Sequence, residues 1–74
     1  MKDYYFTYGS NHTTDEGFSL GNFYTKVPAE SYGEARERMF LARGDKGAFQ
    51  YLSAEEAGVE RFRLMEAPLE RVTL

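Results

Sequence analysis

One helix start stands between two β-like segments, and this arrangement restricts the folds open to the chain. Ser31-Tyr32-Gly33-Glu34 is a capping box, in which the serine and the glutamate satisfy two otherwise free helix amides. The helical period continues to Arg43, and Gly44 favours a left-handed end, so we predict a helix over about 31–43. Short connections on both sides of a single helix make the strands before and after it run in the same direction. The predicted buried stripe, with Phe40 at its flank, is Tyr32, Ala35, Met39 and Ala42.

Four segments have the composition and alternation of β-strands. The first, Asp3–Tyr8, is apolar on both of its faces, which is typical of a strand in the middle of a sheet. The others are Phe18–Val27, Ala48–Leu52 and Glu60–Glu66. With the first strand between its two neighbours, the sheet is mainly antiparallel, with three or four strands in the order 2-1-3-4 and the helix on one face. The sequence therefore predicts a single small α+β domain over residues 1–74.

Composition limits how such a domain can be stabilised. In 74 residues there are six Tyr, six Phe and no Cys, so neither a disulfide nor a thiolate metal site supports the fold. A chain of this length buries only about 60% of its surface on folding, so the core is thin and a homodimer would add buried area. Nine basic and twelve acidic residues give a net charge of -3, which argues against general affinity for nucleic acid. No apolar run is long enough for a membrane span or a secretory leader, so we expect a cytoplasmic protein without membrane contact.

A polar loop from Gly9 to Gly17 holds the residues most suggestive of chemistry. A nucleophile, a base and an acid could be assembled from Ser10, His12 and Asp15, but residues so close in one loop are seldom held with the accuracy that catalysis needs. One histidine among scattered carboxylates has neither the number nor the spacing of metal ligands. From these residues we predict no catalytic site, no metal and no cofactor.

The aromatic opening strand runs directly into Tyr8-Gly9-Ser10-Asn11. This segment resembles the opening motif of the γ-glutamyl cyclotransferase-like family, in which a strand ends in a Tyr-Gly-Ser-Asn-type loop whose backbone amides hold the carboxylate of the substrate. The resemblance implies, as an alternative function, a small cyclotransferase-like enzyme that uses the Gly9-Ser10-Asn11 loop. Such an enzyme also needs a carboxylate in a pocket beside the loop, and Glu55 or Glu66 would supply it.

Several tyrosines and one leucine are predicted to lie at the surface, where amphipathic rings are common in protein interfaces. One helix cannot cover both faces of the sheet, which leaves tyrosine rings on the open face, and Leu41 falls among charged residues on the helical wheel. We therefore predict a protein-binding site that combines these anchors with charged residues that steer the approach of a partner. Its members are Tyr5, Tyr24, Tyr51, Leu41, Arg36, Arg38, Glu55 and Glu56. The same sheet aromatics suit a single-stranded nucleic-acid-binding domain, a second alternative that the net charge disfavours.

Two stretches around the helix carry a further resemblance: Ala29-Glu30-Ser31-Tyr32-Gly33-Glu34-Ala35-Arg36 enters it, and Gly44-Asp45-Lys46-Gly47-Ala48-Phe49-Gln50-Tyr51 leaves it. Together with the aromatic opening strand, they look like small uncharacterised proteins encoded by bacteriophages and prophages. The resemblance implies a non-catalytic binding module that acts in the host cytoplasm. Its partner would be a host protein or protein–nucleic acid complex, and it would inhibit a host defence protein in the manner of anti-CRISPR proteins.

Overall fold

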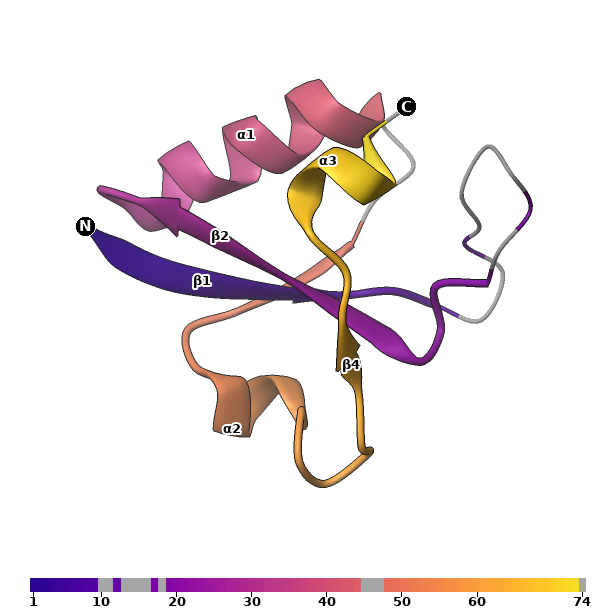
Figure 1. Ribbon diagram of the computed structural model, residues 1–74. Coiled ribbons are helices and arrows are strands. Elements are labelled where there is room, and N and C mark those ends of the chain that lie inside the picture. The colour runs from indigo at the N-terminus through magenta and orange to yellow at the C-terminus, as the bar shows by residue number, and fades with distance from the viewer. Residues whose placement is uncertain (10–11, 13–16, 18, 45–47, 74) are drawn as a thin grey trace.

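Strand β1 (Lys2–Thr7) is an inner strand of a four-stranded mixed sheet in the computed structural model, which describes residues 1–9, 12, 17, 19–44 and 48–73 (Figure 1). It pairs antiparallel with β2 (Phe23–Ala29) on one side and with β3 (Phe49–Tyr51) on the other. The short β4 (Met65–Glu66) runs parallel to β2, and the strand order is β3-β1-β2-β4. The predicted α+β class and the inner position of the first strand are confirmed.

Side chains alternate along β1, so the sheet has one fully buried and one half-buried face. Tyr4 and Phe6 point into the core and are buried, whereas Tyr5 and Thr7 lie on the opposite face and are half-buried. Both faces of this strand are covered to some extent, which explains why its sequence is apolar on both sides.

Helix α1 (Tyr32–Arg43) begins and ends where the sequence indicates. The Ser31 hydroxyl accepts a hydrogen bond from the Glu34 amide at 3.1 Å, and the Glu34 carboxylate accepts one from the Glu30 amide at 3.3 Å. Gly44 follows the last turn with a φ of 64°, a value that favours glycine. The predicted helix over 31–43 is confirmed, with Ser31 as its N-cap.

The buried stripe of α1 consists of small residues and one methionine. Ala35, Met39 and Ala42 are buried against the sheet, as predicted. Tyr32, predicted as a member of this stripe, is instead 42% exposed. It lies in the first turn of the helix, where its ring meets the Tyr4 ring edge-on, with centroids 6.0 Å apart, at the rim of the core.

Strand β2 begins and ends later than the predicted Phe18–Val27. Its last two residues, Pro28 and Ala29, are the register partners of Asp3 and Lys2 in β1. Proline is tolerated here because β4 pairs only with the first two residues of β2, which leaves one side of Pro28 without a partner strand among the described residues.

Of the predicted strand over Glu60–Glu66, only Met65–Glu66 is extended, and its predicted place beside the third strand is wrong. Residues 58–63 form turns, in which Gly58 and Arg63 have positive φ values of 77° and 53°, so this segment does not extend as a strand. After the one-turn helix α2 (Ala54–Ala57), the chain passes across the face of the sheet opposite α1 and reaches β2 (Figure 1). The order is therefore β3-β1-β2-β4 rather than 2-1-3-4, and the β2–β4 pair is parallel.

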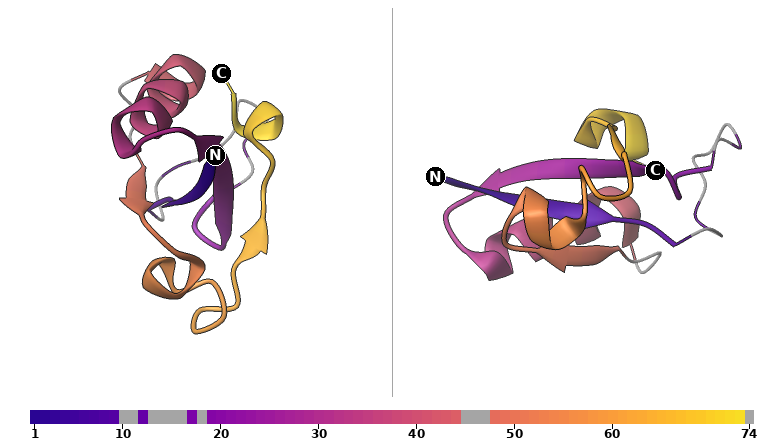
Figure 2. Two further views of the ribbon diagram at one scale, coloured as in Figure 1. Left: turned by 90° about the vertical axis from the view of Figure 1, so that its left-hand side faces the viewer. Right: turned by 90° about the horizontal axis from the view of Figure 1, so that it is seen from below.

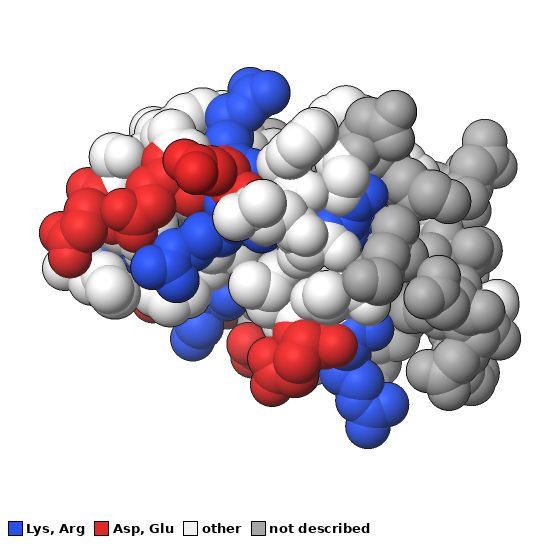
Figure 3. Space-filling view, turned by 90° about the horizontal axis from the view of Figure 1, so that it is seen from above, with Lys and Arg blue, Asp and Glu red and all other residues white. Residues whose placement is uncertain are grey.

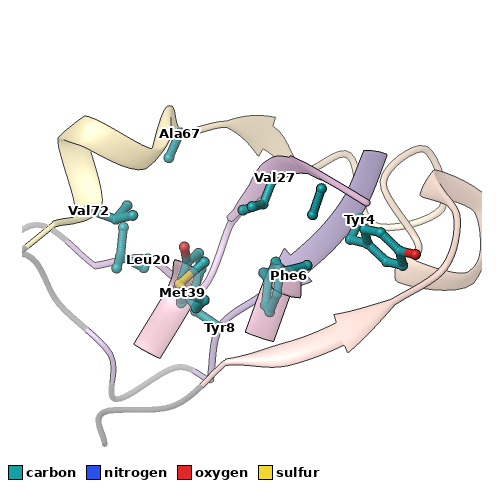
Figure 4. Close-up of a cluster of buried hydrophobic side chains, with 10 residues drawn as sticks. Tyr4, Phe6, Tyr8, Leu20, Val27, Met39, Ala67 and Val72 are labelled. Atoms are coloured by element: carbon teal, nitrogen blue, oxygen red, sulfur yellow. The ribbon is translucent and has the colours of Figure 1, made fainter. Parts of the chain in front are cut away.

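A third helix, α3 (Leu69–Val72), closes the core beside α1 and is absent from the sequence prediction. It lies on the same side of the sheet as α1, whereas α2 lies on the other side (Figure 2). The core is therefore enclosed between the sheet and these two helices, and its side chains come from β1, β2, α1, α3 and the segments next to them (Figure 4). They are Tyr4, Phe6, Tyr8, Leu20, Val27, Ala29, Ala35, Met39, Ala67 and Val72.

Candidate binding surface

The three predicted tyrosine anchors lie together on the sheet face opposite α1. Tyr5 is the register partner of Tyr51 across the β1–β3 pair, and the rings of Tyr5 and Tyr24 are 6.0 Å apart. All three side chains are half-buried, because α2 and the turns after it lie on this side of the sheet (Figure 2). The structure brings the tyrosines together, but it leaves only part of each ring accessible to a partner.

Leu41 and the predicted basic residues lie on α1, on the other side of the sheet from the tyrosines. Leu41 is 77% exposed, as the helical wheel predicts. Arg38 Nη2 lies 3.3 Å from Glu34 Oε1, the spacing of a pair one helical turn apart. Charged side chains of both signs gather over this face (Figure 3). Because the sheet separates Leu41 from the tyrosines, these anchors do not form one continuous surface.

Glu55 and Glu56 lie at the exposed start of α2, on the tyrosine side of the sheet. Glu56 has a role within the chain: its amide donates to Ser53 Oγ at 3.1 Å, and its carboxylate accepts a hydrogen bond from the Leu52 amide at 3.4 Å. This second capping box fixes the short helix directly after β3. Glu55 is exposed and lines a separate shallow hollow with Glu60 and Arg61.

A groove of about 530 Å³ lies between α1 and β3, and most of its lining falls outside the predicted site. Phe6 and Met39 are buried core residues, so they form its floor. Phe40 of α1 and Phe49 of β3 line it from opposite sides and are 61% and 60% exposed. By the alternation along β3, the Phe49 side chain lies with Thr7 on the sheet face opposite α1. The remaining lining residues are Tyr32, Arg36, Glu37, Gly44, Ala48 and Gln50. Of the eight predicted site residues, this surface includes Arg36.

A helical period does point to one wall of this groove. Tyr32, Arg36 and Phe40 repeat at intervals of four residues, so they form a second stripe beside the buried one. The sequence does not indicate which strand this stripe accompanies, because that depends on how the helix crosses the sheet. Sequence reasoning therefore assigned Phe40 only to the flank of the buried stripe.

Strand β3 is an edge strand, and its outer side has no partner strand among the described residues. Its three residues, Phe-Gln-Tyr, include no charge and no proline. The side-chain amide of Gln50 donates to the Tyr32 carbonyl at 3.0 Å and so ties the middle of β3 to the start of α1. The Oε1 atom of the same amide is buried and has no donor within the part of the chain that the structure describes. The edge and the groove wall are thus held as one unit.

Two hydroxyl groups, of Tyr8 and Thr25, form a hydrogen-bonded chain in the core. Thr25 Oγ1 donates to the Ala67 carbonyl at 2.8 Å, so its single proton is used, and the Tyr8 hydroxyl 2.6 Å away must donate to it. Burial raises the pKa of the Tyr8 phenol, although the Thr25 hydrogen bond and the positive charge of Arg43 oppose this shift.

Arg43 joins the same cluster from the end of α1. Its guanidinium lies 5.4 Å from the centre of the Tyr8 ring and donates through Nη1 to the Val72 carbonyl at 2.7 Å. Arg43 and Thr25 are fully buried, so no ligand reaches them from solvent. We assign the cluster a structural role: it ties α1, the sheet and α3 together.

The polar loop after β1 lies largely outside the described residues, among them Ser10, Asn11 and Asp15. His12 is described and half-buried; its amide donates to the Gly9 carbonyl at 3.0 Å, and its ring stands edge-on to Tyr8. The resemblance to the cyclotransferase-like motif, and the enzymatic alternative built on it, therefore stay predictions.

Nowhere in residues 1–9, 12, 17, 19–44 and 48–73 do three or more His, Asp or Glu side chains gather so as to hold a metal ion. In the same ranges the helices are too short and too polar to cross a membrane. No family model matches the chain, and neither a curated protein nor a solved structure matches it. A functional assignment therefore depends on the geometry described above.

Proposed function

We propose that this protein is a non-catalytic binding module that recognises another polypeptide through the groove between α1 and β3 and the free edge of β3. The observation that carries the proposal is the combination of the two features in one place. An extended segment added to a free strand edge gains main-chain hydrogen bonds, and a groove beside that edge receives its alternate side chains. Two phenylalanines that are more than half exposed lie at this place: Phe40 on the groove wall formed by α1, and Phe49 on the free edge strand.

The exposure of these rings supports an interface better than a purely structural role. Single, scattered apolar side chains are normal on a protein surface. A contiguous group of them beside an unpaired strand edge is instead typical of an interaction site. Tyr32, which lines the groove, and Leu52, which directly follows β3, are exposed as well. Arg36 and Glu37 line the same groove and supply charges that orient a partner.

Site-specific photo-crosslinking in living cells tests the proposal. A benzophenone amino acid replaces Phe49 in one variant and Phe62 in a matched control. Phe62 is 64% exposed, close to the 60% of Phe49, but it lies in the turns after α2. We expect protein adducts at position 49 and few at position 62, and the position 49 adducts should decrease when Phe40→Ser removes the apolar wall of the neighbouring groove. Equal labelling at the two positions, or none at position 49, would contradict the proposal.

A further inference from the structure

We infer that the polypeptide bound at this site is a second copy of the same chain, with the two β3 strands paired antiparallel across a two-fold axis. This inference rests on the proposed function, because it uses the same groove and strand edge. It extends the four-stranded sheet into a continuous eight-stranded one, and both α1 helices lie on the same side of it.

The two edges of the sheet differ in how they are protected. Natural edge strands are commonly kept from pairing by charged residues, prolines or very short length. The β4 edge has these features, because it is two residues long, includes Glu66 and is followed closely by Pro68. The β3 edge is also short, at three residues, but it includes no charged residue or proline that would block an added strand. An additional strand can therefore pair with the β3 edge of the sheet more readily than with the β4 edge.

The residues of β3 are complementary to themselves. In an antiparallel pair centred on Gln50, Phe49 of each copy lies opposite Tyr51 of the other, and both rings lie on the sheet face opposite α1. Aromatic pairs in opposing positions stabilise antiparallel strands. The hydrogen bond from Gln50 to the Tyr32 carbonyl keeps each edge in place before the copies meet, which lowers the entropy lost on association.

The charges of the groove are self-complementary as well. A two-fold axis normal to the sheet makes the two α1 helices antiparallel. Gln50 lines the same groove as Arg36 and Glu37, so an axis beside Gln50 passes near the middle of each helix. Arg36 and Glu37 occupy the middle of α1, line the groove, and make no ion pair with any described residue. Across the axis, Arg36 of each copy faces Glu37 of the other, which gives two reciprocal ion pairs. A partner with unrelated sequence would need its own matching charges.

The exposed area is sufficient for a modest dimer. Tyr32, Phe40, Phe49 and Leu52 together expose on the order of 400 Å², if one large side chain presents about 200 Å² when fully exposed. The strand backbone and the stems of Arg36 and Glu37 bring each copy toward the roughly 600 Å² per partner at which specific interfaces begin. The whole chain exposes 5111 Å², whereas a folded monomer of 8.5 kDa is expected to expose about 4,700 Å². We therefore expect self-association in the micromolar range rather than tighter.

Charge reversal with restoration tests the two-fold arrangement. Sedimentation equilibrium, from about 1 µM to about 1 mM protein, measures the dissociation constant of the wild type and of four variants. Arg36→Glu and Glu37→Arg each place like charges across the axis, so each should weaken the dimer by at least about tenfold. The double variant Arg36→Glu/Glu37→Arg restores opposite charges in both pairs and should return the constant to within about threefold of wild type. Arg71→Glu, on α3, is the matched control and should have no effect, and circular dichroism confirms that every variant is folded.

The outcomes separate this inference from the proposed function. A wild type that stays monomeric to about 1 mM, combined with adducts to a different protein at position 49, overturns the dimer and supports the binding module. Adducts at position 49 between two copies of this chain, together with restoration by the double variant, support both. Single variants that weaken association without restoration by the double variant overturn the two-fold arrangement. Absence of both adducts and self-association overturns the proposed function and the inference together.

Discussion

Replacing Thr25 by valine tests whether the buried hydroxyl chain stabilises the fold. Thr25 is fully buried; its Oγ1 donates to the Ala67 carbonyl and accepts from the Tyr8 hydroxyl. Valine has nearly the same shape, so Thr25→Val removes two hydrogen bonds and opens no cavity. The substitution leaves the hydroxyl of Tyr8 and the carbonyl of Ala67 without these partners in a low-dielectric environment.

The size of the effect follows from these two groups. An unsatisfied buried polar group costs about 1–3 kcal/mol, and the added methyl group of valine returns about 0.8 kcal/mol. We expect Thr25→Val to lower the free energy of unfolding by about 2–4 kcal/mol. This is a large part of the roughly 4–11 kcal/mol available to a domain of this length. The melting temperature should fall by at least about 10 °C.

Urea denaturation followed by circular dichroism measures this change, and Tyr8→Phe completes a double-mutant cycle. Without the tyrosine hydroxyl, Thr25→Val leaves one orphaned group instead of two, so its effect should be smaller by about 1–2 kcal/mol. Thr7→Val is the matched control: Thr7 lies half-buried on the opposite face of β1, and its replacement should change stability by less than about 0.5 kcal/mol. Additive effects of the two core substitutions, within about 0.3 kcal/mol, would refute the hydroxyl chain.

Three further changes have defined outcomes. Because burial raises the pKa of Tyr8 above its ordinary value of 10.0, its contribution to stability is complete below pH 10.0 and is lost as the pH rises toward the folded pKa. Relative to Tyr8→Phe, the wild type should therefore lose about 1.4 kcal/mol per pH unit above that point, as measured by urea denaturation at each pH, and parallel curves would contradict this. Gly58→Ala should cost about 2–3 kcal/mol, because φ is 77° and the new Cβ would lie 2.5 Å from Cδ2 of Phe62. In a Phe62→Ala background only the backbone part, about 1 kcal/mol, should remain, and an unchanged cost would show that the ring is not responsible. Ser31→Ala should cost about 1 kcal/mol in thermal unfolding by removing the N-cap of α1, whereas no loss would mean that this cap is dispensable.

The elements predicted correctly are those whose signals are local. The capping box at Ser31 and the positive φ at Gly44 fix both ends of α1 within a few residues of sequence. Alternation along β1, apolar on both faces, identifies a strand with neighbours on both sides. The single helix that connects β2 to β3 makes these two strands run in the same direction. With β1 between them, both of its pairs are antiparallel.

The fourth strand depends on contacts that no local pattern encodes. Met65–Glu66 is too short to show a period, and it pairs with residues of β2 about forty positions earlier in the chain. The alternation over Glu60–Glu66 suggested a strand, but Arg63 adopts a left-handed conformation that arginine rarely shows. The predicted strand pattern was therefore overridden by the path the chain takes to reach β2.

The predicted binding residues illustrate a different limit. The sequence correctly indicated that Leu41 is exposed and that α1 carries solvent-facing charges, because a helical wheel contains that information. It did not indicate that α2 would lie over the side of the sheet holding Tyr5, Tyr24 and Tyr51, nor that Phe40 and Phe49 would line the same groove. Both facts depend on how separate elements pack. The predicted host defence partner, and the two alternatives of a cyclotransferase-like enzyme and a single-stranded nucleic-acid-binding domain, stay predictions.

The groove and the thin core have a common cause in the composition of α1. Its sheet-facing positions include Ala35 and Ala42, so the helix contributes little volume and the large core rings come from β1 instead. The aromatic residues of α1, Tyr32 and Phe40, then have no space under the helix and project at its side. They project toward an edge strand of three residues, where neither a further strand nor another described helix covers them. Filling the interior better, for example with a leucine at position 42, would not remove this exposed wall. Only a polypeptide seated against β3 would bury it, which is why the stability of this domain and its binding are expected to be coupled.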